Sequence, residues 1–102
     1  MNFINHENEL TWNSKYQALY FHATWVPFNQ KLIHILDNIA DNLPNVPLFA
    51  IDVDYFKGFC KRFNITNIPT IIIMENGKEI KRIQGVTHSK EFIATFDDIC
   101  TK

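Results

Sequence analysis

The chain has 102 residues, with 10 Lys and Arg against 11 Asp and Glu, for a formal net charge of −1. This length predicts one domain over residues 1–102, and 46% hydrophobic residues exclude a disordered or fibrous chain. The near-zero charge argues against a nucleic-acid-binding protein and against a polybasic membrane anchor. The two cysteines, Cys60 and Cys100, are too few for a disulfide-rich scaffold, and we expect no metal or cofactor.

The beginning of the chain carries acids and amides where a secretory signal needs an apolar run. The longest apolar run, Ile71–Met74, is far shorter than a membrane span. These features favour a cytoplasmic protein. The first fifteen residues are weakly patterned and predict at most a short strand and one helical turn.

Residues 18–23 form an apolar run rich in aromatic side chains, which predicts a buried strand. Pro27 indicates the first turn of a helix, because proline fits that position. Apolar residues then recur at helical spacing as far as Leu43, where Pro44 predicts the end of the helix. Residues 46–53 predict a second buried strand.

Three elements and a turn follow in the second half. Phe56, Phe59, Cys60 and Phe63 predict a short amphipathic helix. Residues 70–74 and 79–84 predict two strands joined at Asn76-Gly77, since this dipeptide favours a tight hairpin turn. A last helix is predicted from Phe92, Ile93, Phe96 and Ile99. The order of the elements predicts an α/β fold with a mixed sheet of four to five strands and helices on both faces.

The chain carries a series of landmarks in a fixed order: Ala23-Thr24-Trp25, the long helix after it, Asp52-Val53-Asp54, Asn64-Ile65-Thr66-Asn67-Ile68-Pro69-Thr70, Asn76-Gly77 and Gly85. In their order and spacing these landmarks resemble those of the thioredoxin family, from about residue 18 onward. The resemblance implies a thioredoxin-like fold and a cis peptide bond between Ile68 and Pro69.

The chain departs from this family at its reactive centre. Thioredoxins continue after the tryptophan as Cys-Gly-Pro-Cys, whereas Trp25 is followed here by Val26-Pro27-Phe28-Asn29. Val26 and Asn29 stand where the attacking and resolving cysteines are expected, and neither side chain forms a thiolate. Tyr20 stands where the family has a buried aspartate. We therefore assign no catalytic residue to these degenerate positions and expect a redox-inactive domain.

Within the family, the chain looks most like the thioredoxin-like domains of multidomain monothiol glutaredoxins. The similar segments are Leu19-Tyr20-Phe21-His22, Trp25-Val26-Pro27 and Leu43-Pro44-Asn45-Val46. This resemblance implies a role in cell redox homeostasis or a link to iron–sulfur assemblies. The functional hypothesis is a docking or adaptor domain that binds a protein or an extended peptide by strand addition. Its predicted partner-binding residues are Trp25, Val26, Pro27, Phe28, Ile68, Pro69 and Thr70.

The alternative is an enzyme, a divergent oxidoreductase of the thioredoxin or glutaredoxin type that uses the single thiol of Cys60. The neighbouring Lys61 and Arg62 would lower the pKa of this thiol if it were exposed. Cys60 also lies on an apolar stripe, which is typical of a buried small side chain. A bridge to Cys100 is not expected, because the resemblance places the two helices on opposite sheet faces. A third hypothesis is a decayed relative that keeps only the fold.

Two other groups of residues have simpler explanations. His22 lies on a predicted buried strand, so we expect a hydrogen-bonded core histidine. Asp52 and Asp54 have the spacing of a metal-binding pair on one strand face. The resembling family has acids at this strand end without a metal, and we predict no metal site here.

Overall fold

The computed structural model describes residues 1–85, 94 and 96–98. The first fifteen residues contain a short strand and one 3-10 turn, as predicted. The elements in chain order are β1 (Asn2–Phe3), η1 (Glu7–Glu9), β2 (Tyr16–His22), α1 (Asn29–Asn42), β3 (Leu48–Asp52), α2 (Lys57–Arg62), β4 (Thr70–Glu75) and β5 (Lys78–Gln84).

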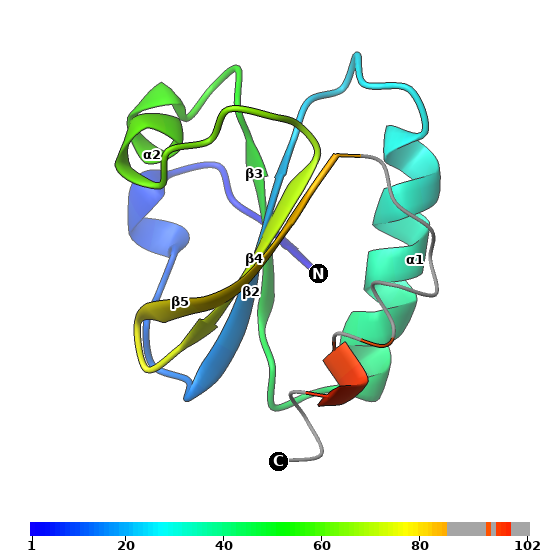
Figure 1. Ribbon diagram of the computed structural model, residues 1–102, viewed down its shortest axis with the longest axis vertical. Helices are drawn as coiled ribbons and strands as arrows, with labels where there is room; N and C mark the ends of the chain where they lie inside the picture. Colours follow the sequence, from blue (N-terminus) through cyan, green and yellow to red (C-terminus); the bar gives the residue numbers. More distant parts are fainter. Residues whose placement is uncertain (86–93, 95, 99–102) are drawn as a thin grey trace.

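The strands form one mixed sheet in the order β1-β3-β2-β4-β5 (Figure 1). Strand β3 pairs in parallel with both β1 and β2, whereas β4 pairs antiparallel with β2 and with β5. Strand β2 is therefore the centre of the sheet. This arrangement confirms the predicted mixed sheet, which has five strands.

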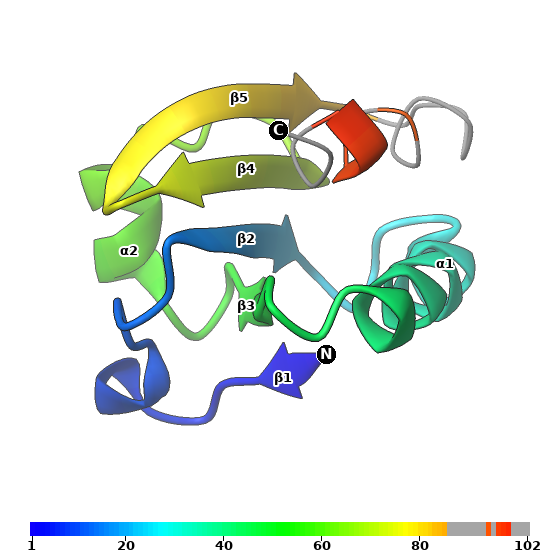
Figure 2. The ribbon, with the colours of Figure 1, turned by 90° about the horizontal axis from the view of Figure 1, so that it is seen from below.

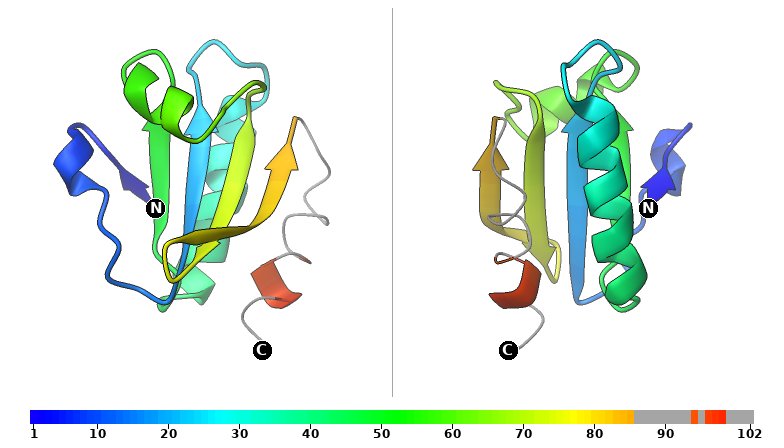
Figure 3. Two further views of the ribbon diagram at one scale, coloured as in Figure 1. Left: turned by 60° about the vertical axis from the view of Figure 1, so that its left-hand side comes forward. Right: turned by 90° about the vertical axis from the view of Figure 1, so that its right-hand side faces the viewer.

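Alternate residues of the strands point to two separate apolar layers, because successive side chains of a strand face opposite ways. Helix α1 lies over one face of the sheet (Figure 3). Its residues Leu32, Leu36 and Ile39 are buried in the layer on that face. Phe56 and Phe59 cover the other face at α2 (Figure 2). The predicted helices on both faces are confirmed. The strand residues of the α1 layer are Ala18, Tyr20, Leu48, Ala50, Ile71, Ile73 and Ile83.

Helix α1 begins at Asn29, and the prediction that Pro27 opens its first turn was wrong. Phe28, the residue before the helix, has φ of 67° and ψ of 8°, in the left-handed region. A bulky residue rarely adopts this conformation, so the sequence pattern favours continuous helix there. The effect is to turn the Phe28 side chain outward, where 65% of its surface is exposed.

The β4–β5 hairpin turns at Asn76 and Gly77, which both have positive φ, as the dipeptide predicts. Residues 96–98 are helical, and Phe96 packs in the α1 layer. The remaining positions of the predicted last helix, Phe92, Ile93 and Ile99, lie outside the described residues, as does Cys100. In the part of the chain that is described, no helix has the length and apolar character of a membrane span.

Arg82 of β5 joins the end of α2 to the sheet. Its Nη2 and Nη1 donate to the backbone oxygens of Phe63 and Asn64, at 2.7 and 3.2 Å. The same guanidinium pairs with Glu79 through bonds of 2.6 and 2.9 Å. Phe63 is the C-cap of α2 and Asn64 follows it, so this cation fixes the segment directly after the helix to the sheet.

We predict that Arg82→Met lowers the free energy of unfolding by about 1.5–3 kcal/mol, since it removes charged hydrogen bonds to the carbonyls of Phe63 and Asn64. Urea unfolding of the variant and the wild type measures this difference. The matched control is Lys81→Met on the same strand, whose side chain is exposed. Its effect should stay within about 0.5 kcal/mol. Equal stability of the Arg82→Met variant and the wild type would contradict this role.

Candidate functional site

The predicted partner-binding residues come from two segments that meet at one edge of the sheet. Residues 23–28 follow the carboxyl end of β2, and residues 68–69 precede β4. Phe21 and Thr70 are paired across these two strands, which places the two segments next to each other (Figure 1). The carboxyl ends of parallel strands in α/β sheets are common binding sites.

The residues of the first segment differ in exposure. Trp25 is 66% exposed and Phe28 is 65% exposed, and Pro27 is also exposed. Val26 is buried, at 7%. A partner therefore has access to three side chains of this segment, whereas the Val26 side chain is covered.

The second segment is mostly covered. The peptide bond between Ile68 and Pro69 is cis, and Ile68 is half-buried. Pro69 is buried, and its carbonyl accepts a bond of 2.8 Å from the Gly85 amide. Thr70 is 1% exposed, and its hydroxyl donates to the Asn67 carbonyl. Ile68 is thus the accessible residue of the three predicted here.

Trp25 is held by the turn that follows β3. Its Nε1 donates to Oδ2 of Asp54 at 3.1 Å, and the Asp54 amide donates to Oδ1 of Asp52 at 2.9 Å. Strand β3 ends at Asp52, so the two acids are not on one strand face as the spacing suggested. Among the described residues, no cluster of three potential metal ligands is found. No sequence signal pairs Asp54 with Trp25, so this contact was not predicted.

Tyr20 and Asn29 form a buried pair beneath the Trp25 segment. The Tyr20 hydroxyl donates to Oδ1 of Asn29 at 2.7 Å, and burial raises the pKa of Tyr20. The resemblance assigns these two residues to the family's buried-aspartate and resolving-cysteine positions. The structure therefore places a hydrogen bond between uncharged groups where the resemblance implies a proton-transferring acid and a thiol.

His22 is buried, as expected, at 6% exposure. Its ring stacks on Tyr20 with centroids 5.1 Å apart and meets the Phe3 ring edge-on at 6.2 Å. The expected hydrogen bond is absent at Nδ1, which has no partner among the described residues. Burial lowers the pKa of His22, and the opposing effect of the Asp52 carboxylate is smaller. The ring is therefore neutral at pH 7.

Cys60 lies on α2, half-buried against the apolar layer on that side. Its thiol donates to the Val53 carbonyl, with Sγ 4.0 Å from the oxygen. Burial raises the pKa of the thiol, and the carboxylates of Asp52 and Asp54 raise it further. Val53 lies between these two acids, so the thiol contacts the same short turn that holds Trp25.

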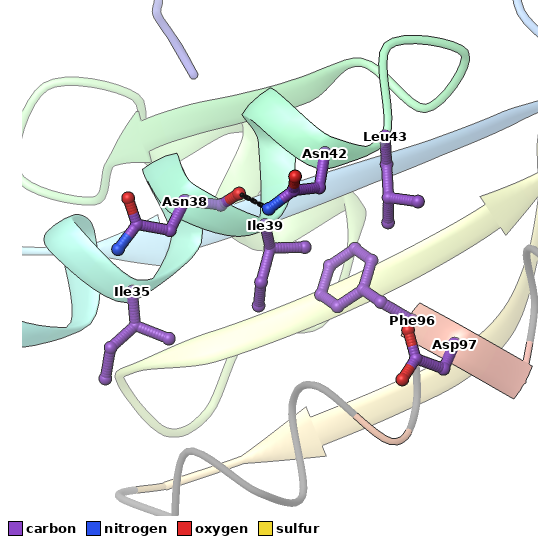
Figure 4. Close-up of a pocket in the computed structure, with 7 residues that line it drawn as sticks. All are labelled: Ile35, Asn38, Ile39, Asn42, Leu43, Phe96 and Asp97. Atoms are coloured by element: carbon purple, nitrogen blue, oxygen red, sulfur yellow. Dashed lines mark hydrogen bonds between the residues drawn. The ribbon is translucent and has the colours of Figure 1, made fainter.

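A separate hollow of about 330 Å³ lies along the second half of α1, beyond the Trp25 segment (Figure 4). Its walls are mainly the apolar side chains of Ile35, Ile39, Leu43 and Phe96. The close-up shows Asn42 bonded back to the Asn38 carbonyl of its own helix. The described residues of this lining include no cysteine, serine or histidine, and the hollow extends the α1 layer.

The family model described as Thioredoxin matches residues 2–98. Thioredoxin H2 of Arabidopsis thaliana is 32% identical over 80 residues, which cover 78% of this chain and 60% of that protein. Thioredoxin of Chlamydia pneumoniae is 33% identical over 73 residues, 72% of this chain and 71% of that protein.

Solved structures agree on the fold. The oxidised thioredoxin of Plasmodium falciparum superimposes with a TM-score of 0.88, at 15% identity and with 96% of each chain covered. Mitochondrial thioredoxin 3 of Saccharomyces cerevisiae gives 0.84, at 21% identity, with 96% of this chain and 94% of that chain covered. The expected thioredoxin-like fold is confirmed.

The main functional prediction, a redox-inactive docking domain, was wrong. The matching family model and the relatives at 32 and 33% identity all carry the name thioredoxin, which points to a redox oxidoreductase. The prediction equated the loss of one cysteine pair with the loss of thiol chemistry. The alternative hypothesis, an oxidoreductase that uses Cys60, fits these findings better. The finer likeness to glutaredoxin domains stays a prediction.

We predict that acid weakens the fold through His22. Between pH 7.5 and 5.5 the unfolded chain binds more protons at this residue than the folded chain, because the folded pKa is lowered. The free energy of unfolding should therefore fall as the pH drops below about 6.5. The variant His22→Phe, which keeps a ring but does not titrate, should flatten this dependence. Urea unfolding at several pH values measures both slopes.

The control for this series is His34→Gln, at an exposed position of α1. It should leave the pH dependence of the wild type unchanged. An identical slope in His22→Phe and the wild type would show that His22 does not cause the loss of stability.

Proposed function

Because this chain belongs to the thioredoxin family, we propose that it is a thiol–disulfide oxidoreductase that acts through the single thiol of Cys60. With Val26 and Asn29 at the family's cysteine positions, the reactive sulfur has to come from elsewhere in the chain. The observation that carries the proposal is the position of Cys60. Its Sγ contacts the carbonyl of Val53, directly beside the acid that holds Trp25.

The proposed reaction has three exchange steps. The Cys60 thiolate attacks a substrate disulfide, and the second substrate sulfur leaves as a thiolate that takes a proton from water. A small thiol then attacks Sγ of Cys60 and releases the reduced substrate. A second small thiol attacks the sulfur of the first and frees Cys60. Overall, one substrate disulfide gains two electrons and two small thiols become a disulfide.

The resemblance to monothiol glutaredoxin domains favours glutathione as the small thiol. A single cysteine cannot close an internal disulfide with a neighbour, so it depends on an external thiol to complete the cycle. The reaction should also be faster above pH 7, because burial and the nearby carboxylates keep Cys60 mostly protonated at neutral pH.

The substrate would be a polypeptide bound at the surface of Trp25, Pro27, Phe28 and Ile68. Exposed aromatic side chains supply much of the binding energy at protein interfaces. The buried residues Val26, Pro69 and Thr70 would shape this surface without direct side-chain contact. An extended segment that lies across it would bring a disulfide toward the turn at Val53.

We predict that the wild type reduces insulin disulfides with glutathione at a rate above background, and that Cys60→Ser loses this rate. Cys100→Ser is the matched control and should keep it. The double variant Val26→Cys/Asn29→Cys restores the family's cysteine pair and serves as the positive control of the assay. If the wild type has no rate while the positive control is active, the proposed function is wrong. The same holds if Cys60→Ser is as active as the wild type.

A further inference from the structure

A pocket of about 450 Å³ opens at the carboxyl ends of β1, β3 and β2. The start of α1 and the turn after β3 form its other walls. Thr24, directly before Trp25, lines the pocket together with Asp52 and Tyr55. The pocket therefore adjoins the proposed substrate surface, but it takes no part in the chemistry of Cys60 described above.

The pocket carries negative charge. Asp52 is the one acidic side chain among its described lining residues, and burial lowers the pKa of His22, which favours the uncharged ring. Neither Asp52 nor Asp54 makes an ion pair with any side chain of the described segments. No lysine or arginine lines the pocket within that same part of the chain. A cation that entered would meet an uncompensated carboxylate.

Aromatic rings stand where such a cation would enter. Tyr55 and Phe3 line the pocket and are 81% and 49% exposed. Trp25 follows the lining residue Thr24 in the chain, is 66% exposed and donates its Nε1 hydrogen to Asp54. The faces of aromatic rings attract cations, and tryptophan does so more strongly than tyrosine or phenylalanine. Exposed rings next to an unpaired carboxylate favour a group that is both cationic and partly apolar.

We propose that this pocket binds an arginine side chain of a polypeptide substrate, with the guanidinium on Asp52 and the stem against Phe3 and Tyr55. That this polypeptide is a substrate rests on the function proposed above. The binding of the arginine does not itself need a reactive thiol. Arginine fits better than lysine because its planar fork matches a carboxylate and stacks on rings. An anionic residue is disfavoured, since it would face Asp52 without a basic partner.

The position of Asp52 also links the binding of an arginine to the reactivity of the Cys60 thiol. Asp52 and Asp54 are the carboxylates that flank Val53, whose carbonyl accepts from Cys60. A guanidinium on Asp52 would neutralise charge that now disfavours the Cys60 thiolate. Substrates with an arginine near their disulfide would therefore both bind and activate the thiol.

The test measures binding without exchange. Two short peptides are compared that differ only in an Arg or a Glu and that carry serine in place of cysteine. The protein carries Trp12→Phe, which leaves Trp25 as its one tryptophan and its fluorescence as the signal. An exposed ion pair and a cation–π contact together predict about 3–10-fold tighter binding of the Arg peptide at low salt.

Two variants test the assignment. Asp52→Asn keeps an acceptor for the Asp54 amide and removes the charge, and it should reduce the preference for the Arg peptide to about twofold or less. Tyr55→Ala should weaken binding of the Arg peptide. The Tyr55 ring is 81% exposed, so its removal should not disturb the fold. The matched control is Asp41→Asn, an exposed acid on α1, which should keep the full preference.

Equal affinity for the two peptides, or a preference that survives in Asp52→Asn, would overturn the proposal. So would tighter binding of a Glu or norleucine peptide, or binding of free arginine as tight as that of the Arg peptide. Adding Cys60→Ser to the protein should not change the preference. An Arg preference without insulin reduction would refute the proposed function alone, and insulin reduction without an Arg preference would refute this pocket alone.

Discussion

The organisation of the molecule depends on strand β2, which is hydrogen-bonded on both sides and buried on both faces. It ends at His22, whose carbonyl accepts a bond of 2.9 Å from the Val53 amide. On the other side, Phe21 is paired with Thr70. The end of this one strand therefore assembles three segments that are distant in the sequence: the Trp25 loop, the turn after β3 and the loop before β4.

The turn after β3 is the part of this assembly with chemical consequences. Asp54 fixes Trp25, Asp52 faces the pocket, and the carbonyl of Val53 between them contacts the Cys60 thiol. The two carboxylates and the carbonyl therefore contact three different parts of the molecule, although they belong to three consecutive residues. Burial raises the pKa of the Cys60 thiol, and the two nearby carboxylates raise it further, so a cationic group bound at this turn would oppose the effect of the carboxylates.

The sequence was sufficient to predict the elements whose patterns are strong. Apolar runs gave the three inner strands, the recurrence of Leu32, Leu36 and Ile39 gave α1, and Asn76-Gly77 gave the hairpin. The start of α1 was not predictable in the same way, because Phe28 adopts a left-handed conformation that its residue type disfavours. Its outward orientation is a result of the tertiary structure.

The candidate site was predictable only in part, for a similar reason. The position of Trp25 and the Ile68–Pro69 loop at one sheet edge followed from the resemblance. The hydrogen bonds from Trp25 to Asp54 and from Tyr20 to Asn29 join residues that no sequence pattern pairs. The functional prediction failed because it relied on the residues at the missing cysteine pair, whereas the relationship to thioredoxins extends over residues 2–98.

The central claim, that Cys60 is the reactive sulfur, is tested most directly by exposing the folded protein to glutathione disulfide and mapping the modified peptide by mass spectrometry. The account predicts a glutathione adduct on Cys60 that forms under native conditions and forms faster at pH 8.5 than at pH 7. A Cys60 that stays unmodified until the protein is unfolded by denaturant would contradict it.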